Sequence, residues 1–362
     1  MRDRKQRDGQ LQQSDRRGLH ALAPDAVWGA LLGAGGVIIV ITAVVTTPSF
    51  LTEYNATLGS TTFSYIALMS LPMTCVIIAG EIDLSVGAVM GLGMAVLARA
   101  IDAGLPAWAA ILAAIGAAAL CGALNGTMVA FLGIPSLVLT IGTLALFSGL
   151  QLGLLGPATF VRVPAWVITI GQGTAGASGV PIALLVVTVA ALLLWLALTK
   201  LRVGSDIYSI GCNRLAAERT GIKVKLTIFW LFVVSGLFAG IAGLLYVGPI
   251  ASINADVGAN VELTVIATVL LGGIDVFGGQ GRVQGVFLAI VIMGLLSDVM
   301  VLHQLTSTVQ SLITGGLLIG AVVGPTALRL RGTGRGRAPT SSALHPRARR
   351  HAPATMVEAR SR

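Results

Sequence analysis

The chain has 362 residues, of which 55% are hydrophobic and only 11% are charged, and its formal net charge is +9. A soluble domain carries about 25% charged residues, and several apolar stretches here exceed the roughly 20 residues that cross a bilayer. The composition therefore excludes an ordinary soluble protein and indicates an all-α, polytopic membrane protein.

The positive charge is concentrated in three segments. Of the 24 Lys and Arg residues, six lie in residues 1–27, six in 200–225 and nine in 329–362. This clustering follows the positive-inside rule and predicts that all three segments, both termini included, are cytoplasmic. It favours roles in topology and headgroup contact over nucleic-acid binding. The three Cys and four His residues show no spacing typical of a disulfide framework or a metal site.

In chain order, we predict a disordered basic tail over residues 1–24, a transmembrane domain over 25–328 and a second disordered basic tail over 329–362. The first apolar run is interpreted as an anchor helix rather than a secretory signal, because no A-x-A-like cleavage site follows it. An external loop with a short helix is predicted over 163–179. The ten predicted spans lie at about 28–45, 58–79, 84–98, 107–129, 136–155, 182–198, 228–247, 262–271, 283–296 and 305–323.

The stretch between the second and third spans combines carboxylates with glycines. Its notable residues are Gly80, Glu81, Asp83, Ser85 and Gly87. Ionised carboxylates at membrane depth are costly and indicate a functional site. Glycines there suggest irregular backbone, which is tolerated only where protein or water covers it. The alternative interpretation is a polar turn at the membrane surface.

A related stretch recurs after the eighth span. Both copies fit the pattern G-x-I-D-[LV]-x-x-G, at an offset of 192 residues, and the second copy contains Gly272, Gly273, Asp275, Gly278 and Gly279. Interrupted segments at matching places in two halves of a chain point to the binding region of a transporter, although a short match in a Gly-rich chain also arises by chance. Counting spans places both copies on the same side, unless residues 262–271 are re-entrant. The chain contains no G-x-x-x-x-G-K-[ST] motif, which predicts that it does not bind ATP itself.

The segment 200–225 is the long polar stretch inside the chain. Its centre, residues 214–220, has a short helical pattern in which Arg214 and Glu218 are spaced to pair. Gly221 is a natural helix stop. One interpretation is that this short helix docks in a groove on a soluble partner. The alternative is that the segment is a charged loop that only sets topology.

Four stretches together resemble a known family. These are residues 80–87, 204–224 with its Tyr-Ser-Ile-Gly, 262–281 with its E-L-x-x-I-A and F-G-G-x-G patterns, and the weaker 135–149. The chain resembles, over roughly residues 50–325, the inner-membrane permeases of ATP-binding-cassette (ABC) importers. The nearest branch is the ribose/arabinose/galactose-type sugar permeases of the branched-chain amino acid/sugar permease family. Glu81 and Cys212 stand where glycine is common in that family.

The resemblance implies a type II ABC importer permease fold of about ten helices with two related halves. It implies a multi-pass protein of the cytoplasmic membrane that moves a sugar by alternating access. The implied partners are cytoplasmic ATPase subunits, an extracytoplasmic sugar-binding protein and a second permease copy, with the lipid bilayer around them and no cofactor or metal. Residues 200–226 become a coupling loop, in which the ATPase-coupling residues are Asn213, Arg214, Ala216, Ala217, Glu218 and Gly221.

Individual polar residues then take expected roles. We expect Asp83, Ser85 and Asp275 to hold the helix breaks by accepting backbone N–H groups, rather than to grip sugar. Candidates for lining the pathway are Asn125, Thr140, Thr143 and Gln151, although small polar residues in spans often bond neighbouring helices instead. Asp298 and His303 are interpreted as an interfacial turn and not as a proton relay.

Two other classes of transporter fit the same pattern. An ion-coupled secondary transporter of a small polar solute would also have broken helices and intramembrane acids, and a passive channel would need neither ATP nor a binding protein. An enzyme is disfavoured, because the sequence contains no nucleophile–base or metal constellation and hence no catalytic residues.

Overall fold

The computed structural model describes residues 24–156, 159–160, 163–176 and 179–333, so the predicted tails at 1–24 and 329–362 lie almost entirely outside the described residues. Thirteen helices and no strands make up the described part. They are α2 (Pro24–Thr46), α3 (Glu53–Ile78), α4 (Val86–Asp102), α5 (Ala107–Ala130), α6 (Ser136–Leu155), α7 (Ala165–Gln172), α8 (Ile182–Lys200), α9 (Arg202–Cys212), α10 (Arg214–Arg219), α11 (Val224–Ile250), α12 (Val261–Leu271), α13 (Val283–Leu302) and α14 (Ser307–Thr333).

Each of the ten predicted spans coincides with one of these helices, which confirms the all-α, polytopic fold. Eight are long and apolar enough to cross a membrane, and the two shorter ones are α4 and α12. The remaining helices are short: α7 lies in the predicted external loop, and α9 and α10 lie in the polar segment 200–225.

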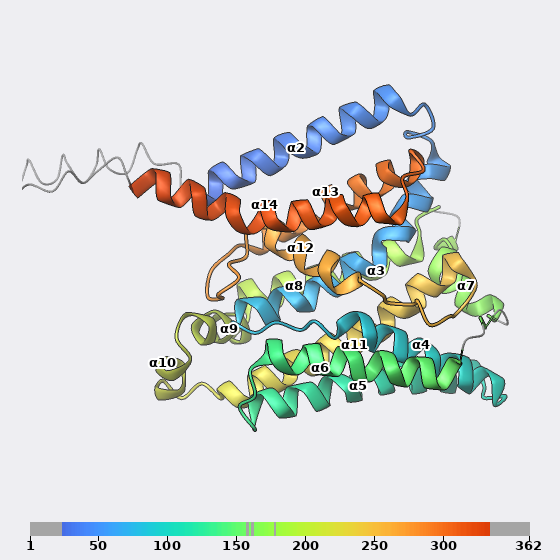
Figure 1. Cartoon of the computed structure of the whole chain (residues 1–362), viewed down its shortest axis with the longest axis horizontal. Helices are drawn as coiled ribbons and strands as arrows, with labels where there is room; N and C mark the ends of the chain where they lie inside the picture. Colours follow the sequence, from blue (N-terminus) through green and yellow to red (C-terminus); the bar gives the residue numbers. More distant parts are fainter. Residues whose placement is uncertain (1–23, 157–158, 161–162, 177–178, 334–362) are drawn as a thin grey trace, which may run out of the picture.

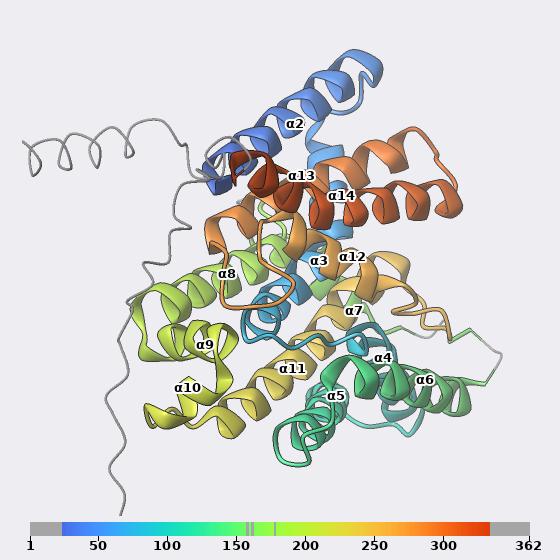
Figure 2. The same cartoon turned by 60° about the vertical axis from the view of Figure 1, so that its left-hand side comes forward.

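The helices form a bundle in which α3 is the most enclosed. Figures 1 and 2 both place α5 and α6 on one side of the molecule and α2, α13 and α14 on the other, with α3 between them. The hydrophobic window of α3 is 89% buried, against 28% or less for α2, α5, α6 and α14. The outer helices therefore present their apolar faces to the surroundings, as lipid-facing helices do.

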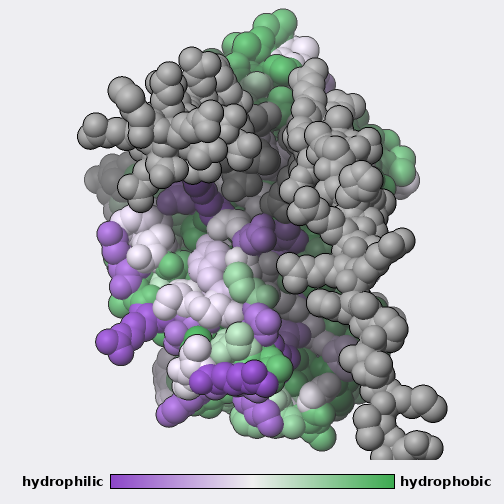
Figure 3. All heavy atoms as spheres, turned by 90° about the vertical axis from the view of Figure 1, so that its left-hand side faces the viewer, coloured by the Kyte–Doolittle hydropathy of each residue, from purple (hydrophilic) through white to green (hydrophobic). Residues whose placement is uncertain are grey.

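One end of the bundle carries α9 and α10, and the opposite end carries α7 (Figure 1). We call the first the basic end, because residues 200–225 hold six Lys and Arg residues. Figure 3 looks onto this end and shows hydrophilic side chains gathered between apolar flanks.

Two helices, α4 and α12, begin inside the bundle, each after a non-helical segment, and these two segments enter the bundle from opposite ends. After α3 ends at the basic end, residues 79–85 run back into the bundle without helical structure, and α4 begins at Val86 (Figure 1). After α11 ends at the opposite end, residues 251–260 return into the bundle and α12 begins at Val261. The 11 residues of α12 rise about 16 Å, roughly half of a hydrocarbon core of about 30 Å.

The closest helix pair is α5 against α11, and glycines make that approach possible. A Cβ atom on Gly236 would lie 3.0 Å from the backbone nitrogen of Gly122, and one on Gly126 would lie 2.8 Å from the carbonyl oxygen of Phe229. Small residues let membrane helices pack backbone to backbone. Together, α5 and α11 form the surface against which residues 79–85 lie.

Candidate functional site

The first interruption, residues 79–85, is organised by the buried carboxylate of Asp83. Gly80, with φ +81°, turns the chain at the end of α3. Asp83 Oδ1 accepts hydrogen bonds from the Ser85 amide (2.9 Å) and the Ser85 hydroxyl (2.7 Å), and Oδ2 accepts one from Ser235 Oγ of α11 (3.1 Å). The carboxylate of Asp83, a residue that is only 2% exposed, therefore accepts three hydrogen bonds, two from Ser85 and one from α11. No pattern in the sequence pointed to Ser235, which lies 152 residues after Asp83 in the chain.

The backbone of the first interruption is bonded to α5 and α6. Asn125 Nδ2 donates to Ser85 Oγ (2.8 Å), the Ile82 amide donates to Ser136 Oγ (3.1 Å), and Thr140 Oγ1 donates to the Ile82 carbonyl (3.3 Å). Extended backbone inside a bundle needs such partners, because it has no helical hydrogen bonds of its own.

The hydroxyl of Thr143, one turn further along α6, donates to the Thr140 carbonyl (3.4 Å). Three of the four residues predicted as possible pathway lining, Asn125, Thr140 and Thr143, are therefore buried and hydrogen-bonded within this chain.

We call residues 272–282, between α12 and α13, the second interruption; it repeats one local feature of the first. Asp275 Oδ1 accepts a hydrogen bond from the Phe277 amide (3.0 Å), two residues on, as Asp83 does from Ser85. This is the Asx-turn geometry that Asp side chains favour. The register differs, because the positive φ falls on Gly80 in the first copy but on Gly273, one position later, in the second.

The two interruptions touch each other at the basic end, as the span count predicts. The Gly279 amide donates to the Ile78 carbonyl (2.8 Å), and a Cβ atom on Gly278 would lie 2.7 Å from the Cα of Gly80. The end of α9 closes the contact: a Cβ atom on Gly211 would overlap the Ile78 carbonyl oxygen, and Cys212 Sγ donates to the Gly279 carbonyl (3.3 Å). We call this contact of Ile78–Gly80, Gly211–Cys212 and Gly278–Gly279 the glycine joint.

The sequence analysis did not identify Gly211 as part of the site. The sequence contained only an indirect indication: Gly211 is the last residue of the Tyr-Ser-Ile-Gly stretch, which carries part of the family resemblance. Tyr208, three residues before Gly211 in α9, donates from its hydroxyl to the Gly281 carbonyl (3.0 Å). Helix α9 thus holds the second interruption at two points.

An ion pair links the first interruption to α10. Arg214 Nη1 lies 3.1 Å from Glu81 Oε1, so the predicted pairing of Arg214 with Glu218 is wrong. The physical reason is burial: the Glu81 side chain is only 11% exposed and needs a counterion, whereas Glu218 is solvated. Burial raises the pKa of Glu81, and Ser136 and Arg214 both oppose that rise.

Helix α10 is built by local capping, and its outer face is exposed. Asn213 Oδ1 accepts a hydrogen bond from the Ala216 amide (3.0 Å) and caps the helix, and Gly221, with φ +87°, follows its end. The predicted helix and its stop are confirmed. Ala217 is buried against the body, while Leu215 is 59% exposed beside the charged residues.

Helices α4 and α12 meet at their N-termini. A Cβ atom on Gly87 would overlap the Gly258 carbonyl oxygen and lie 2.6 Å from Glu262 Oε2. Gln151 Nε2 of α6 donates to three carbonyls of the returning segment, those of Asn254 (3.3 Å), Ala255 (3.2 Å) and Val257 (3.1 Å). Gln151 therefore holds the non-helical segment 251–260 against α4.

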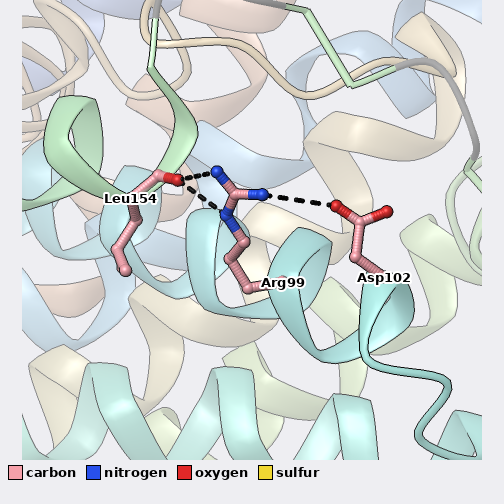
Figure 4. A network of polar contacts seen from close by, with 3 residues as sticks. All are labelled: Arg99, Asp102 and Leu154. Carbon is pink, nitrogen blue, oxygen red and sulfur yellow. Dashed lines mark hydrogen bonds and ion pairs between the residues drawn. The ribbon is translucent and has the colours of Figure 1, made fainter.

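The far end of α4 is fastened to the end of α6. The Arg99 guanidinium donates twice to the Leu154 carbonyl, once from Nε at 2.6 Å, and lies 3.5 Å from Asp102 Oδ2 (Figure 4). Both residues of the ion pair are partly exposed, so the bond to the carbonyl is the more specific restraint.

Asp298 and His303 serve as links between helices. Asn55 Nδ2 of α3 donates to Asp298 Oδ2 (2.8 Å), and His303 Nε2 lies 3.1 Å from Thr46 Oγ1 at the end of α2. Among the described residues, no three His, Cys, Asp or Glu side chains are grouped so that they could hold a metal ion.

Comparison with known proteins identifies the family. Residues 55–322 match the family described as the branched-chain amino acid transport system permease component. The autoinducer 2 import system permease protein LsrD of Photorhabdus temperata is 33% identical over 279 residues, which cover 75% of this chain and 83% of the relative. The LsrD proteins of Escherichia coli (strain K12) and Shigella flexneri are each 31% identical over 302 residues, or 82% of this chain and 91% of the relative.

No solved structure matches the chain significantly. The family match and the LsrD relatives both extend over most of the helical bundle, including both interruptions and α9–α10. The chain therefore belongs to the family of branched-chain amino acid transport system permease components.

Proposed function

We propose that this chain is the permease subunit of an ATP-driven importer that moves a monosaccharide or a similar small polyhydroxylated molecule across the cytoplasmic membrane. The glycine joint is the observation that carries the proposal. It places the two interrupted segments in contact with α9 and, through Glu81 and Arg214, with α10. A movement of α10 therefore reaches the first interruption through the Arg214–Glu81 ion pair, and it reaches the second through α9 and the glycine joint.

The partners follow from the surfaces at the two ends. The exposed face of α10 docks on a cytoplasmic ATP-binding-cassette subunit, and the basic end together with both termini faces the cytoplasm. A second permease copy completes the pathway, and an extracytoplasmic binding protein delivers the cargo at the α7 end. The chain itself supplies no ATPase motif.

The mechanism is alternating access. Closure of the ATPase subunits on ATP moves α10, and the ion pair and the glycine joint pass that movement to residues 79–85 and 272–282. The spans around them tilt, and the pathway opens to the loaded binding protein. Asp83, Ser85 and Asp275 keep the local turns intact during the movement, since the bonds between Asp83 and Ser85 and between Asp275 and the Phe277 amide lie within the interruptions.

The cargo is assigned to the sugar class on two grounds. The motifs of the chain resemble those of sugar-type permeases, and its relatives are named as autoinducer 2 import permeases. Autoinducer 2 is accordingly the second candidate cargo. An uptake assay with labelled ribose, galactose, fucose and autoinducer 2, in cells with and without this chain, decides between them.

The energy source is tested in the same cells. We expect uptake to survive an uncoupler while ATP is held constant, and to stop when the partner ATPase carries an inactivating substitution. Collapse of uptake with the uncoupler alone would favour the ion-coupled transporter, and uptake that survives both treatments would favour the passive channel.

The docking role of α10 has its own test. Residues 214–221 are replaced by a Gly/Ser linker of equal length, and the membrane-extracted protein is purified with its ATPase partner. We expect the partner to be lost, because the exposed face is removed. A partner that still co-purifies in full yield would exclude this docking site.

A further inference from the structure

The meeting point of α4 and α12 lies near the middle of the bundle. The α6 residues beside it, Leu144, Ser148 and Gln151, are the ninth, thirteenth and sixteenth of the 20 residues of that helix. Helix α12 rises about 16 Å from this point to the basic end, about half of the bilayer core. The point is therefore at membrane depth rather than at a surface.

The backbone around this point is irregular and exposed. Asp256, Ala259 and Asn260, in the segment that precedes α12, are exposed in the single chain. Lipid does not tolerate exposed non-helical backbone or polar side chains at such depth. This face must therefore border a second copy or a water-filled space, and in a transporter that space is the pathway.

A cavity of about 190 Å³ opens on this face between α4, α6 and the segment before α12. That volume corresponds to about six water molecules in the liquid, or to one small solute. Glu262 and Gln151 line its buried part, and Ser148 and Asn260 line its exposed part. Its walls also include the apolar Leu144 and Ala88.

Glu262 is the unusual residue of the cavity. It is only 9% exposed, it carries no ion pair, and apart from its own backbone amide no group in the described part of the chain donates to its carboxylate. It lies in the first turn of α12 and its Oε2 is beside Gly87 in the first turn of α4. The positive ends of two helix dipoles stabilise a negative charge there, but its hydrogen-bonding capacity is left for something in the cavity.

The available groups suit a neutral, hydroxyl-rich molecule. A carboxylate accepts hydrogen bonds from two hydroxyls, and the hydroxyl of Ser148 and the amide of Asn260 both donate and accept. Among the described residues, no Lys or Arg side chain lines the cavity, so a phosphate or carboxylate would face Glu262 without a counterion from this part of the chain. The volume fits one molecule of monosaccharide size and excludes an oligosaccharide.

We propose that this cavity is a binding site for a neutral polyhydroxylated substrate within the membrane, in which Glu262 accepts substrate hydroxyls. The proposal rests on the function proposed above and adds the residues that touch the cargo. Substrate released from the binding protein then pauses between the N-termini of α4 and α12, where tilting of either helix changes the shape of the site.

The test compares Glu262→Gln with Glu53→Gln in the complete importer. Glu53 is a matched control, because it is also a Glu in the first turn of a helix but is exposed. Uptake of labelled ribose, galactose and fucose is measured for each variant together with ATPase activity. We expect Glu262→Gln to lower uptake of the transported sugar at least tenfold, with ATPase activity unchanged, while Glu53→Gln has no effect.

Selectivity separates substrate contact from a structural role. Deoxy analogues of the transported sugar, each lacking one hydroxyl, are compared in the unsubstituted protein and in Glu262→Gln. An analogue that lacks the contacted hydroxyl should be taken up poorly by the unsubstituted protein and should lose nothing further in Glu262→Gln. Equal losses for every sugar would overturn the proposal.

A second measurement does not depend on Glu262 variants folding. Ser148→Cys is made in a background whose native cysteines are replaced by Ala, and its rate of thiol labelling is measured with and without the sugar. We expect at least fivefold protection at residue 148 and none for Ser307→Cys, an exposed residue of α14 outside the cavity. Absence of protection, in an importer that takes up the sugar, overturns the cavity assignment and leaves the proposed function standing.

An importer that takes up none of the sugars but takes up leucine or valine would overturn both proposals, because the cargo class itself would then be different.

Discussion

The two interruptions share a sequence pattern and an Asx turn, but they are held in different ways. Asp83 is buried and bonded to α11, and its neighbours are bonded to α5 and α6. Asp275 is only partly buried, and the hydrogen bonds of its backbone remain within residues 275–280. The second interruption is instead held from outside, by glycine contacts to α3 and α9. The same motif is therefore held by side chains of α5, α6 and α11 in one half and by contacts with α3 and α9 in the other.

The largest expected effect is that of Asp83→Ala compared with Asp275→Ala. Removing the Asp83 carboxylate leaves the Ser85 amide and two hydroxyls without their acceptor inside the bundle, and each unsatisfied buried group costs about 1–3 kcal/mol. We expect Asp83→Ala to lower the free energy of unfolding by about 3 kcal/mol or more and Asp275→Ala by about 1 kcal/mol. Thermal unfolding of the detergent-solubilised proteins measures both, and equal losses would remove the distinction between the two interruptions.

Next in size is the effect of Gly211→Ala at the glycine joint. The added methyl group overlaps the Ile78 carbonyl, and relief of such overpacking typically costs about 1–3 kcal/mol. Because the joint connects both interruptions, uptake should fall at least tenfold even where folded protein is recovered. Gly149→Ala on α6 is the control, since nothing lies within 4 Å of its Cβ position. Normal uptake by Gly211→Ala would show that the joint does not transmit movement.

The ion pair between Glu81 and Arg214 should matter more for coupling than for stability. Because burial raises the pKa of Glu81, the folded protein binds a proton more readily than the unfolded chain. The free energy of unfolding of the unsubstituted protein, compared with that of Glu81→Gln, should therefore increase as pH falls through the raised pKa of Glu81. It should decrease as pH rises through the same range. At neutral pH we expect Glu81→Gln to be nearly neutral for thermal stability.

Uptake by Glu81→Gln, by contrast, should fall several-fold, because the link from the first interruption to α10 is cut. Arg214→Ala should lower uptake similarly, and the double variant should be no worse than either single one. Additive losses would mean that the two residues act separately.

The smallest effect on folding is expected for Phe277→Ala in the second interruption. The side chain is 89% exposed, so stability should change by no more than about 0.5 kcal/mol. An exposed aromatic beside the docking segment is suited to contact a partner. We therefore expect weaker co-purification of the ATPase subunit, measured against the neighbouring substitution Val276→Ala. Unchanged co-purification would make this side chain irrelevant to assembly.

Most of the helices could be predicted from the sequence, since long apolar runs and the spacing of basic segments determine them. Residues 262–271 were predicted as a span of only ten residues, and the structure places the 11-residue helix α12 there. What the pattern could not reveal was contact between distant segments. Arg214 illustrates the reason: helical spacing offered Glu218, but the buried carboxylate 133 residues earlier was the stronger partner.

The same limit applies to the candidate site. Asp83 and Asp275 stand out in sequence because charge is rare in this chain, whereas Ser235 and Gly211 are ordinary residues of a membrane helix. Gln151 was predicted as pathway lining, and its three bonds to the segment 254–257 could not be foreseen, because that segment has no pattern of its own. Glu262 was noted only as part of the family resemblance, and its role depends on a cavity that no spacing encodes.

The fastening of α4 at both ends limits how this half of the protein can deform. Asp83 and Ser85 fix its beginning, and Arg99 ties its last turn to the end of α6 (Figure 4). Because α4 is bonded at both ends, we expect α4 and α6 to tilt together when the basic end is displaced, so that the bend falls in the non-helical residues 79–85 rather than within α4.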